Sequence, residues 1–235
     1  MGLTIHFTLK APPETDAAGA LDLVCLMRQR AQGFKQRGRV ERVSPIVTDR
    51  KALLWAREYR DVPHPWHAGK RSGIEIPAVH GFMFFVEVGE DCEPLRLALG
   101  HYPKTVVMGG RRYRTELCGW RFRGFCKTQY ASAHGWEHFR RCHTAVIDLL
   151  RGLGLGLEMS DEGDYWPGRR LDLLRKNLNE MNGVVAAAAG AMKDIGGAGV
   201  ESPIFAHPQF ERLEAEGAAR VSPVLEKLRT AIGER

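Results

Sequence analysis

Side chains that could move a proton are concentrated in residues 117–166. His138 and His143 fall in a segment with helical spacing, and Asp161 and Glu162 stand in an acidic turn soon after it. A histidine can transfer a proton near neutral pH, and a carboxylate can orient that histidine or act as the base. The sequence therefore predicts His143, His138, Asp161 and Glu162 as the catalytic candidates.

Cationic side chains stand close to these histidines in the sequence. Alternation with a period of two over residues 120–130 predicts a strand with one apolar face and one cationic face. The acidic turn at 160–166 adds two aromatic residues that could stack against a ligand. The ligand-binding candidates are three cations, an amide and these two aromatic residues. They are Arg121, Arg123, Lys127, Gln129, Tyr165 and Trp166.

Together these groups predict a cleft for a small anionic ligand, phosphorylated or carboxylated, within residues 117–166. Its walls would be the strand at 117–130, the start of a helix at 135–152 and the acidic turn. The cations would hold the anion, a histidine would move a proton, and a carboxylate would orient that histidine. The cationic and histidine-bearing faces must converge, and a β-bulge at Gly124 is one route. The sequence leaves open whether the ligand is only bound or also processed.

Each of these residues also has a purely structural interpretation. A histidine on the inner face of a helix is more often a hydrogen-bonded packing residue, and Cys126 on the apolar side of the strand is more often an inert thiol. His138 and Cys142, four residues apart, could reach one metal ion. However, neither an H-E-x-x-H motif nor a paired C-x-x-C motif is present. We therefore expect no metal centre, and the sequence identifies no cofactor.

The net charge of +6 is distributed unevenly along the chain. Residues 25–71 hold twelve Lys and Arg against four Asp and Glu, and residues 104–143 hold nine against two. Basic blocks of this kind can bind the phosphates of nucleic acid, so a nucleic-acid-binding module is the first alternative function. No RRM, KH or zinc-finger pattern accompanies them, and they could equally decorate separate solvated faces.

Residues 169–194 predict a long helix, because their apolar positions repeat every three to four residues. The part from Ala186 to Ala191 consists of small residues and would let another backbone approach closely. Covering the sheet is one explanation, and a helix–helix seam between two copies is the other. The second alternative function is therefore a non-catalytic interaction protein that forms a homodimer.

Alternating apolar patterns, such as residues 3–9 and 79–88, are mixed with helical patterns and predict an α+β fold. We expect a mixed or antiparallel sheet of about five to six strands, covered by helices, with βαβ or ferredoxin-like elements and a helical C-terminus. Residues 1–195 would form a single domain. Residues 196–235 would form a helical extension that packs on it.

Residues 61–77 are rich in proline and carry His64 and His67, and they are expected to form a long loop. The five cysteines are irregularly spaced, which argues for reduced thiols rather than a disulfide framework. No apolar run reaches the length of about 18 residues that a membrane span needs, and the first residues lack the layout of a signal peptide. A soluble cytoplasmic protein with no membrane partner is therefore expected.

Three strings in the middle of the chain are distinctive: FCKTQYAS at 125–132, FRRCH at 139–143 and DEGDYW at 161–166. They resemble strings of a bacterial protein family of unknown function. The resemblance implies no activity, cofactor or site residue. It adds only that the same central stretch is worth testing.

Overall fold

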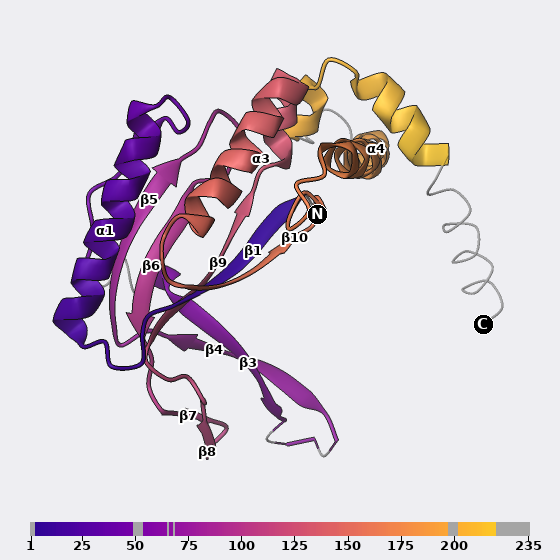
Figure 1. The fold of residues 1–235 in the computed structure, drawn as a ribbon. Coiled ribbons are helices and arrows are strands. Elements are labelled where there is room, and N and C mark those ends of the chain that lie inside the picture. Colours follow the sequence, from indigo (N-terminus) through magenta and orange to yellow (C-terminus); the bar gives the residue numbers. More distant parts are fainter. Residues whose placement is uncertain (1–2, 49–53, 65, 68, 197–201, 220–235) are drawn as a thin grey trace.

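A single antiparallel sheet organises the molecule in the computed structural model, which describes residues 3–48, 54–64, 66–67, 69–196 and 202–219. In this part of the chain the main sheet has six strands in the order β10-β1-β9-β6-β5-β2 (Figure 1). Helices accompany the sheet, which confirms the predicted α+β class. The strands are β1 (Thr4–Lys10), β2 (Arg42–Val43), β5 (His80–Glu87), β6 (Leu95–His101), β9 (Trp120–Lys127) and β10 (Gly156–Asp161).

Strands β9 and β10 lie on either side of β1. Both pair antiparallel to β1, so they run parallel to each other. The 3-10 helix η1 (Gln129–His134) and helix α3 (Trp136–Arg151) connect them. Two parallel strands joined by a helix, with an antiparallel strand between them, form the split βαβ unit of ferredoxin-like folds.

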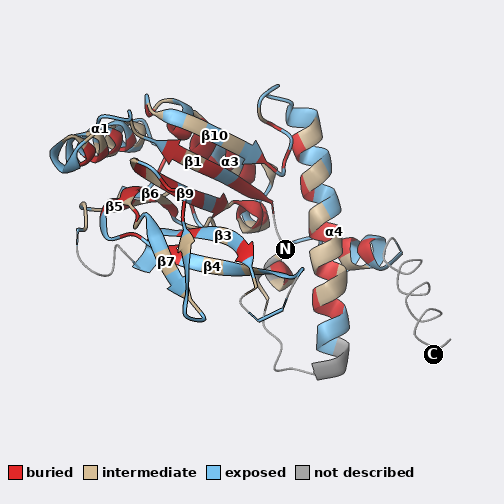
Figure 2. Cartoon of the chain, turned by 90° about the horizontal axis from the view of Figure 1, so that it is seen from below, coloured by how far each residue is buried: buried red, intermediate tan, exposed pale blue. Residues whose placement is uncertain are grey.

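Helices α1 (Ala17–Gln36) and α3 cover one face of the sheet (Figure 2). Strand β1 shows why this face is apolar: Ile5, Phe7 and Leu9 alternate toward the helices and are at most 2% exposed. Between them, His6 points to the opposite face and is exposed. We call that opposite side the open face. Of the helices in the described residues, none has the length and apolarity to span a membrane.

Helix α4 (Leu171–Gly196) makes two different contacts along its length. Near its start, Leu174 and Leu178 are buried in the main core. Further along, Ala186 and Ala189 form a second apolar cluster. The long helix predicted at 169–194 therefore packs on the sheet domain through its first half alone.

The partner of the second half of α4 is the segment at 203–219 of the same chain. This segment contains the 3-10 helix η3 (Pro203–Ala206) and helical residues 210–219. A Cβ atom on Gly217 would lie only 1.8 Å from the carbonyl oxygen of Gly183, so the two backbones touch. The small residues of α4 thus allow a close backbone approach, although the contact is at Gly183, just before the predicted stretch 186–191, and in the described part the approaching backbone comes from this chain.

Two hairpins project from the sheet (Figure 1). One joins β3 (Arg57–Pro63) to β4 (Arg71–Pro77), and we call it the arm; the other joins β7 (Thr105–Met108) to β8 (Arg111–Arg114). The prediction of a long loop at 61–77 is therefore wrong, because the arm is paired from Arg57 opposite Pro77 to Pro63 opposite Arg71.

Candidate functional site

His143 lies in a closed polar site between helix α3 and the face of the sheet that the helices cover. Its Nδ1 is 2.8 Å from Oγ1 of Thr128, and its Nε2 is 3.1 Å from Oδ1 of Asp161. The side chains of His143 and Asp161 are both 0% exposed. The rings of Phe139 and Tyr165 lie against the imidazole, with centroids 5.4 and 6.3 Å away. The sequence correctly placed His143 beside the acidic turn, but a ligand cannot reach the imidazole in this conformation.

Asp161 organises the turn that follows β10. Its Oδ1 accepts a hydrogen bond from the amide of Gly163 at 2.8 Å, and its Oδ2 accepts from the amides of Tyr165 and Trp166 at 2.9 and 3.0 Å. Burial raises the pKa of this carboxyl, but the contact with His143 and the backbone amides outweigh burial, so the pKa lies below its ordinary value. The ionised carboxylate of Asp161 therefore stabilises the turn.

The predicted cations lie on the other side of the sheet. Strand β9 pairs with β1 in unbroken register from Lys127 to Arg121, so there is no bulge at Gly124. A Cβ atom on Gly124 would be 2.6 Å from the rings of Phe122 and Phe7, which explains the glycine by close packing. The cations and His143 consequently do not converge on one cleft.

The remaining sequence-predicted residues have structural partners. Gln129 accepts a hydrogen bond from the amide of Leu3 and donates one to Asn182, all within the core. Trp166 lies under the guanidinium of Arg151, 4.7 Å from its ring centroid. Tyr165 is buried.

His138 and Glu162 lie apart from His143 as well. The Nε2 atom of His138 is 3.1 Å from the carbonyl oxygen of Glu90. Glu162 accepts a hydrogen bond from the amide of Thr4 at 2.9 Å, and its other carboxylate oxygen is 3.4 Å from Nε2 of His6. An imidazole next to an orienting carboxylate, predicted for His143, therefore also occurs on the open face, where it is formed by His6 and Glu162.

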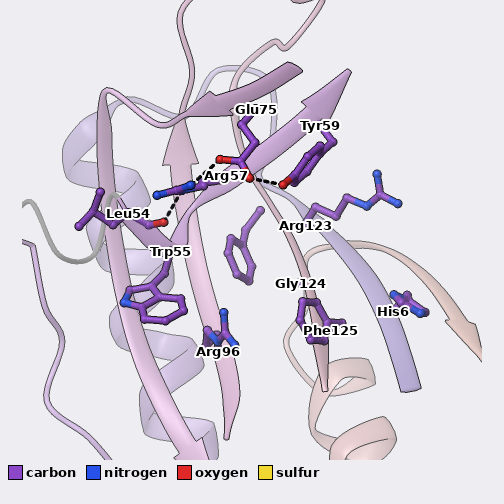
Figure 3. Close-up of a pocket in the computed structure, with 11 residues that line it drawn as sticks. His6, Leu54, Trp55, Arg57, Tyr59, Glu75, Arg96, Arg123, Gly124 and Phe125 are labelled. Carbon is purple, nitrogen blue, oxygen red and sulfur yellow. Dashed lines mark hydrogen bonds and ion pairs between the residues drawn. The ribbon is translucent and has the colours of Figure 1, made fainter. Parts of the chain in front are cut away.

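A cavity of about 700 Å³ lies between the open face and the base of the arm (Figure 3). Its size is within the range of small-molecule sites, about 300–1,000 Å³. Strands β1, β6 and β9 form one wall, and the arm with the residues just before it forms the other. The side chains on which the argument depends are His6, Trp55, Tyr59, Arg96, Arg123 and Phe125.

The carboxylate and most of the cations at this cavity are already paired. Glu75 is held by both Tyr59 and Arg57, and these hydrogen bonds, with that of Tyr59 the stronger, lower the pKa of the carboxyl. Arg96 forms an ion pair with Glu93 at 3.0 Å. Within the described residues, by contrast, the side chain of Arg123 makes no hydrogen bond, ion pair or ring contact.

Most of this site was not predicted from the sequence. Only Arg123 was among the candidates, because it alternates with apolar residues in β9. Trp55 and Tyr59 belong to residues 49–60, whose weak periodicity predicts a helix with a strand as the alternative, and Arg96 belongs to a hairpin strand predicted at 95–99. Their approach to β9 depends on how the arm folds back, and no local pattern encodes that.

Three thiols meet at the other end of β9. Cys92 lies near the thiols of Cys126 and Cys142, which belong to β9 and α3, and its own Sγ is 3.6 Å from the carbonyl oxygen of Lys127. The Sγ atom of Cys142 is also 3.7 Å from Nε2 of His138. Nevertheless, no group of three or more His, Cys, Asp or Glu side chains in the described residues has the spacing to hold a metal ion. The neighbouring Cys92 thiol and burial raise the pKa of Cys142, and the neighbouring Cys126 thiol and burial raise the pKa of Cys92.

These thiols should therefore be slow to alkylate. With iodoacetamide at pH 8, we expect exposed Cys25 and Cys118 to react at least roughly tenfold faster than Cys92 and Cys142, because only a thiolate attacks the reagent. Peptide mass spectrometry over a time course measures each rate. Unfolding in urea is the control and should make the rates similar. Equal rates for Cys142 and Cys25 in the native protein would contradict the cluster.

Comparisons of the chain with protein-family models, with curated proteins and with solved structures found no match. No relative therefore suggests a ligand or a reaction for either site. The geometry of the open face and the chemistry of the side chains there are the features that indicate a function.

Proposed function

We propose that the cavity between the open face and the arm binds a small anionic ligand that carries an aromatic ring. The observation that carries the proposal is Arg123, a guanidinium with no partner among the described residues that lines the cavity. An anion there would supply charge-assisted hydrogen bonds that the protein itself leaves unmade. The anionic ligand predicted from the sequence is thus kept, and its site moves from the His143 side to the open face.

Charge at the cavity favours an anion. The lining contains Arg57, Arg96 and Arg123 together with His6, against the single carboxylate of Glu75. Cavities lined mainly by one sign of charge concentrate the electric field and attract ligands of the opposite sign. The predicted contribution of Arg123 to ligand binding stays part of this proposal.

Aromatic side chains supply the second half of the proposal. Trp55 and Tyr59 are each 54% exposed and Phe125 is 37% exposed, although they come from two different walls of one cavity. The guanidinium of Arg96 lies 4.7 Å from the ring centroid of Trp55 and 5.5 Å from that of Phe125, which holds the two rings near each other. Exposed aromatic rings beside a guanidinium suit a ligand that has a flat ring and a negative charge.

Removing the unpaired cation tests the proposal. We expect Arg123→Gln to weaken binding of the aromatic sulfonate 8-anilinonaphthalene-1-sulfonate about tenfold, since one charged hydrogen bond contributes about 1.5–3 kcal/mol. Fluorescence titration at fixed ionic strength measures the affinity. The matched control is Arg112→Gln on β8, which removes the same charge from an exposed position outside this cavity. Equal affinities of the two variants would overturn the proposal.

The two alternative functions remain predictions, with less support. Within the described residues, five cations of the basic blocks are engaged in ion pairs, among them Arg39 with Asp148 and Arg42 with Glu87, which leaves somewhat less charge for the phosphates of nucleic acid. For a homodimer through α4, the small residues are already in contact with the segment at 203–219. The catalytic roles of His143, His138, Asp161 and Glu162 likewise remain predictions.

A further inference from the structure

The cavity of the proposed function continues into a second one. The second cavity, of about 420 Å³, also lies on the open face, over β1, β9 and β10. His6, Tyr59 and Arg123 line both cavities, so Arg123 stands at their common boundary. A ligand held by Arg123 can therefore extend in two directions, toward the aromatic rings of the first cavity and into the second.

The second cavity has an excess of unpaired positive charge. It is lined by two carboxylates, and each is already neutralised: Glu58 accepts from Arg121 at 2.8 Å, and Glu158 is paired with Lys10. Arg60 also lines this cavity, and its side chain, like that of Arg123, makes no hydrogen bond or ion pair with any other described residue. Two guanidinium groups without partners thus face one space.

Hydroxyl groups on the floor of the second cavity add neutral donors. Thr8 on β1 and Ser160 on β10 both line it, and neither side chain forms a hydrogen bond within the described residues. Two guanidinium groups and two hydroxyls suit a dianion with several acceptor oxygens better than a carboxylate, which has two oxygens and one charge. Trp55 and Phe125 line the first cavity alone, Tyr59 lines both cavities, and Phe7 is the other Phe, Tyr or Trp residue in the lining of the second.

We propose that the ligand is a phosphate monoester of an aromatic or heteroaromatic compound. Its ring lies in the first cavity among Trp55, Tyr59 and Phe125, and its phosphate lies in the second between Arg123 and Arg60. This inference rests on the proposed function, because it assigns a chemical class to the ligand of the same site. It further assigns to Arg60, a residue that the sequence did not indicate, the selection of phosphate over smaller anions.

The test compares each phosphate ester with the alcohol from which it is made. Phenyl phosphate is compared with phenol, and AMP with adenosine, by displacement of 8-anilinonaphthalene-1-sulfonate at constant ionic strength. We expect at least one ester to bind at least tenfold more tightly than its alcohol. Arg60→Gln should reduce the affinity for that ester about tenfold and for the alcohol less than twofold, because it removes one charged contact to the phosphate alone. Arg112→Gln is the control and should leave both affinities unchanged.

Several results would overturn this inference. If neither ester binds more tightly than its alcohol, or if Arg60→Gln affects ester and alcohol equally, the phosphate assignment fails while binding of the fluorescent sulfonate still supports the proposed function. Inorganic phosphate binding as tightly as the esters would show that the ring has no role. A ten-nucleotide single strand binding far more tightly than AMP would assign the groove to nucleic acid instead. Failure of every aromatic anion to bind would remove the proposed function itself.

Discussion

Replacing Asp161 by alanine is expected to lower the free energy of unfolding by about 3–5 kcal/mol, the range for removing one partner of a buried ion pair. The carboxylate accepts three backbone hydrogen bonds in the turn after β10 and contacts His143. Without it, buried amides and the imidazole lose their acceptor, at about 1–3 kcal/mol for each unsatisfied group. Urea unfolding followed by circular dichroism measures the difference from the native protein.

The dependence of this effect on pH has a definite sign. The pKa of Asp161 is lower in the folded protein than the ordinary value of about 3.9 for an unfolded chain. Its charged form therefore stabilises the fold fully above about pH 4, and this stabilisation is lost as the pH falls through the folded-state pKa. Asp161→Asn, which keeps the shape, should show a shallower loss of stability on the acid side. A loss below about 1 kcal/mol for Asp161→Ala would contradict a structural role for this network.

Replacing Glu58 by alanine is expected to lower the free energy of unfolding by about 2–3 kcal/mol, because a hydrogen bond between charged groups is lost. The same change is expected to weaken ligand binding. Glu58 lies on β3, its side chain is 3% exposed, and it accepts a hydrogen bond from Nε of Arg121 on β9 at 2.8 Å. The change would leave a largely buried guanidinium without its partner. It would also remove the ion pair that ties the arm to the sheet, and the arm supplies Arg57 and Tyr59 to the first cavity. The change frees Arg121 beside the second cavity as well, but for 8-anilinonaphthalene-1-sulfonate we expect the displacement of the arm to have the larger effect.

Two measurements separate these consequences. Urea unfolding gives the change in stability, and titration with 8-anilinonaphthalene-1-sulfonate gives the change in affinity. Glu58→Gln is the matched variant: it keeps an acceptor for Arg121 and should retain more of both properties. If Glu58→Ala leaves stability within about 0.5 kcal/mol and affinity unchanged, the arm is not held by this pair.

The sequence itself indicates that the cationic face of residues 120–130 and the histidine-bearing face of the helix could not meet in one cleft. A strand with one apolar face and a helix with one apolar face must bury those two faces against each other. His143 lies on the apolar side of α3, so it faces the apolar side of β9 and leaves Arg121 and Arg123 on the opposite side of the sheet. Only a bulge at Gly124 could have changed this, and the glycine is there instead because the rings of Phe7 and Phe122 leave no room for a side chain.

The elements of the sheet domain were readily predicted, whereas the arm was not. Residues 3–9 and 120–127 alternate strongly because one face of each strand is buried beneath the helices. Strands β3 and β4 are exposed over most of their length and are rich in charge and proline, so their alternation is weak. Since the arm forms one wall of the cavity, the site could not be assembled from local patterns.

The contrast between the two polar sites is the main result for function. The site at His143 brings together the predicted imidazole and carboxylate, but both side chains are sealed from solvent. The cavity between the open face and the arm is reachable, and the guanidinium of Arg123 in its lining has no partner among the described residues. Burial and the backbone hydrogen bonds of Asp161 favour stability, whereas accessibility and an unmade charged contact favour binding.

Amide chemical shifts would locate the ligand most directly. Protein labelled with ¹⁵N would be titrated with 8-anilinonaphthalene-1-sulfonate, and its ¹H–¹⁵N spectrum followed to saturation. We predict that the largest shifts occur at Tyr59, Arg123 and Phe125, and that the amides around His143 and Asp161 move little. Largest shifts at His143 and Asp161, with β9 and the arm unchanged, would contradict a ligand site on the open face.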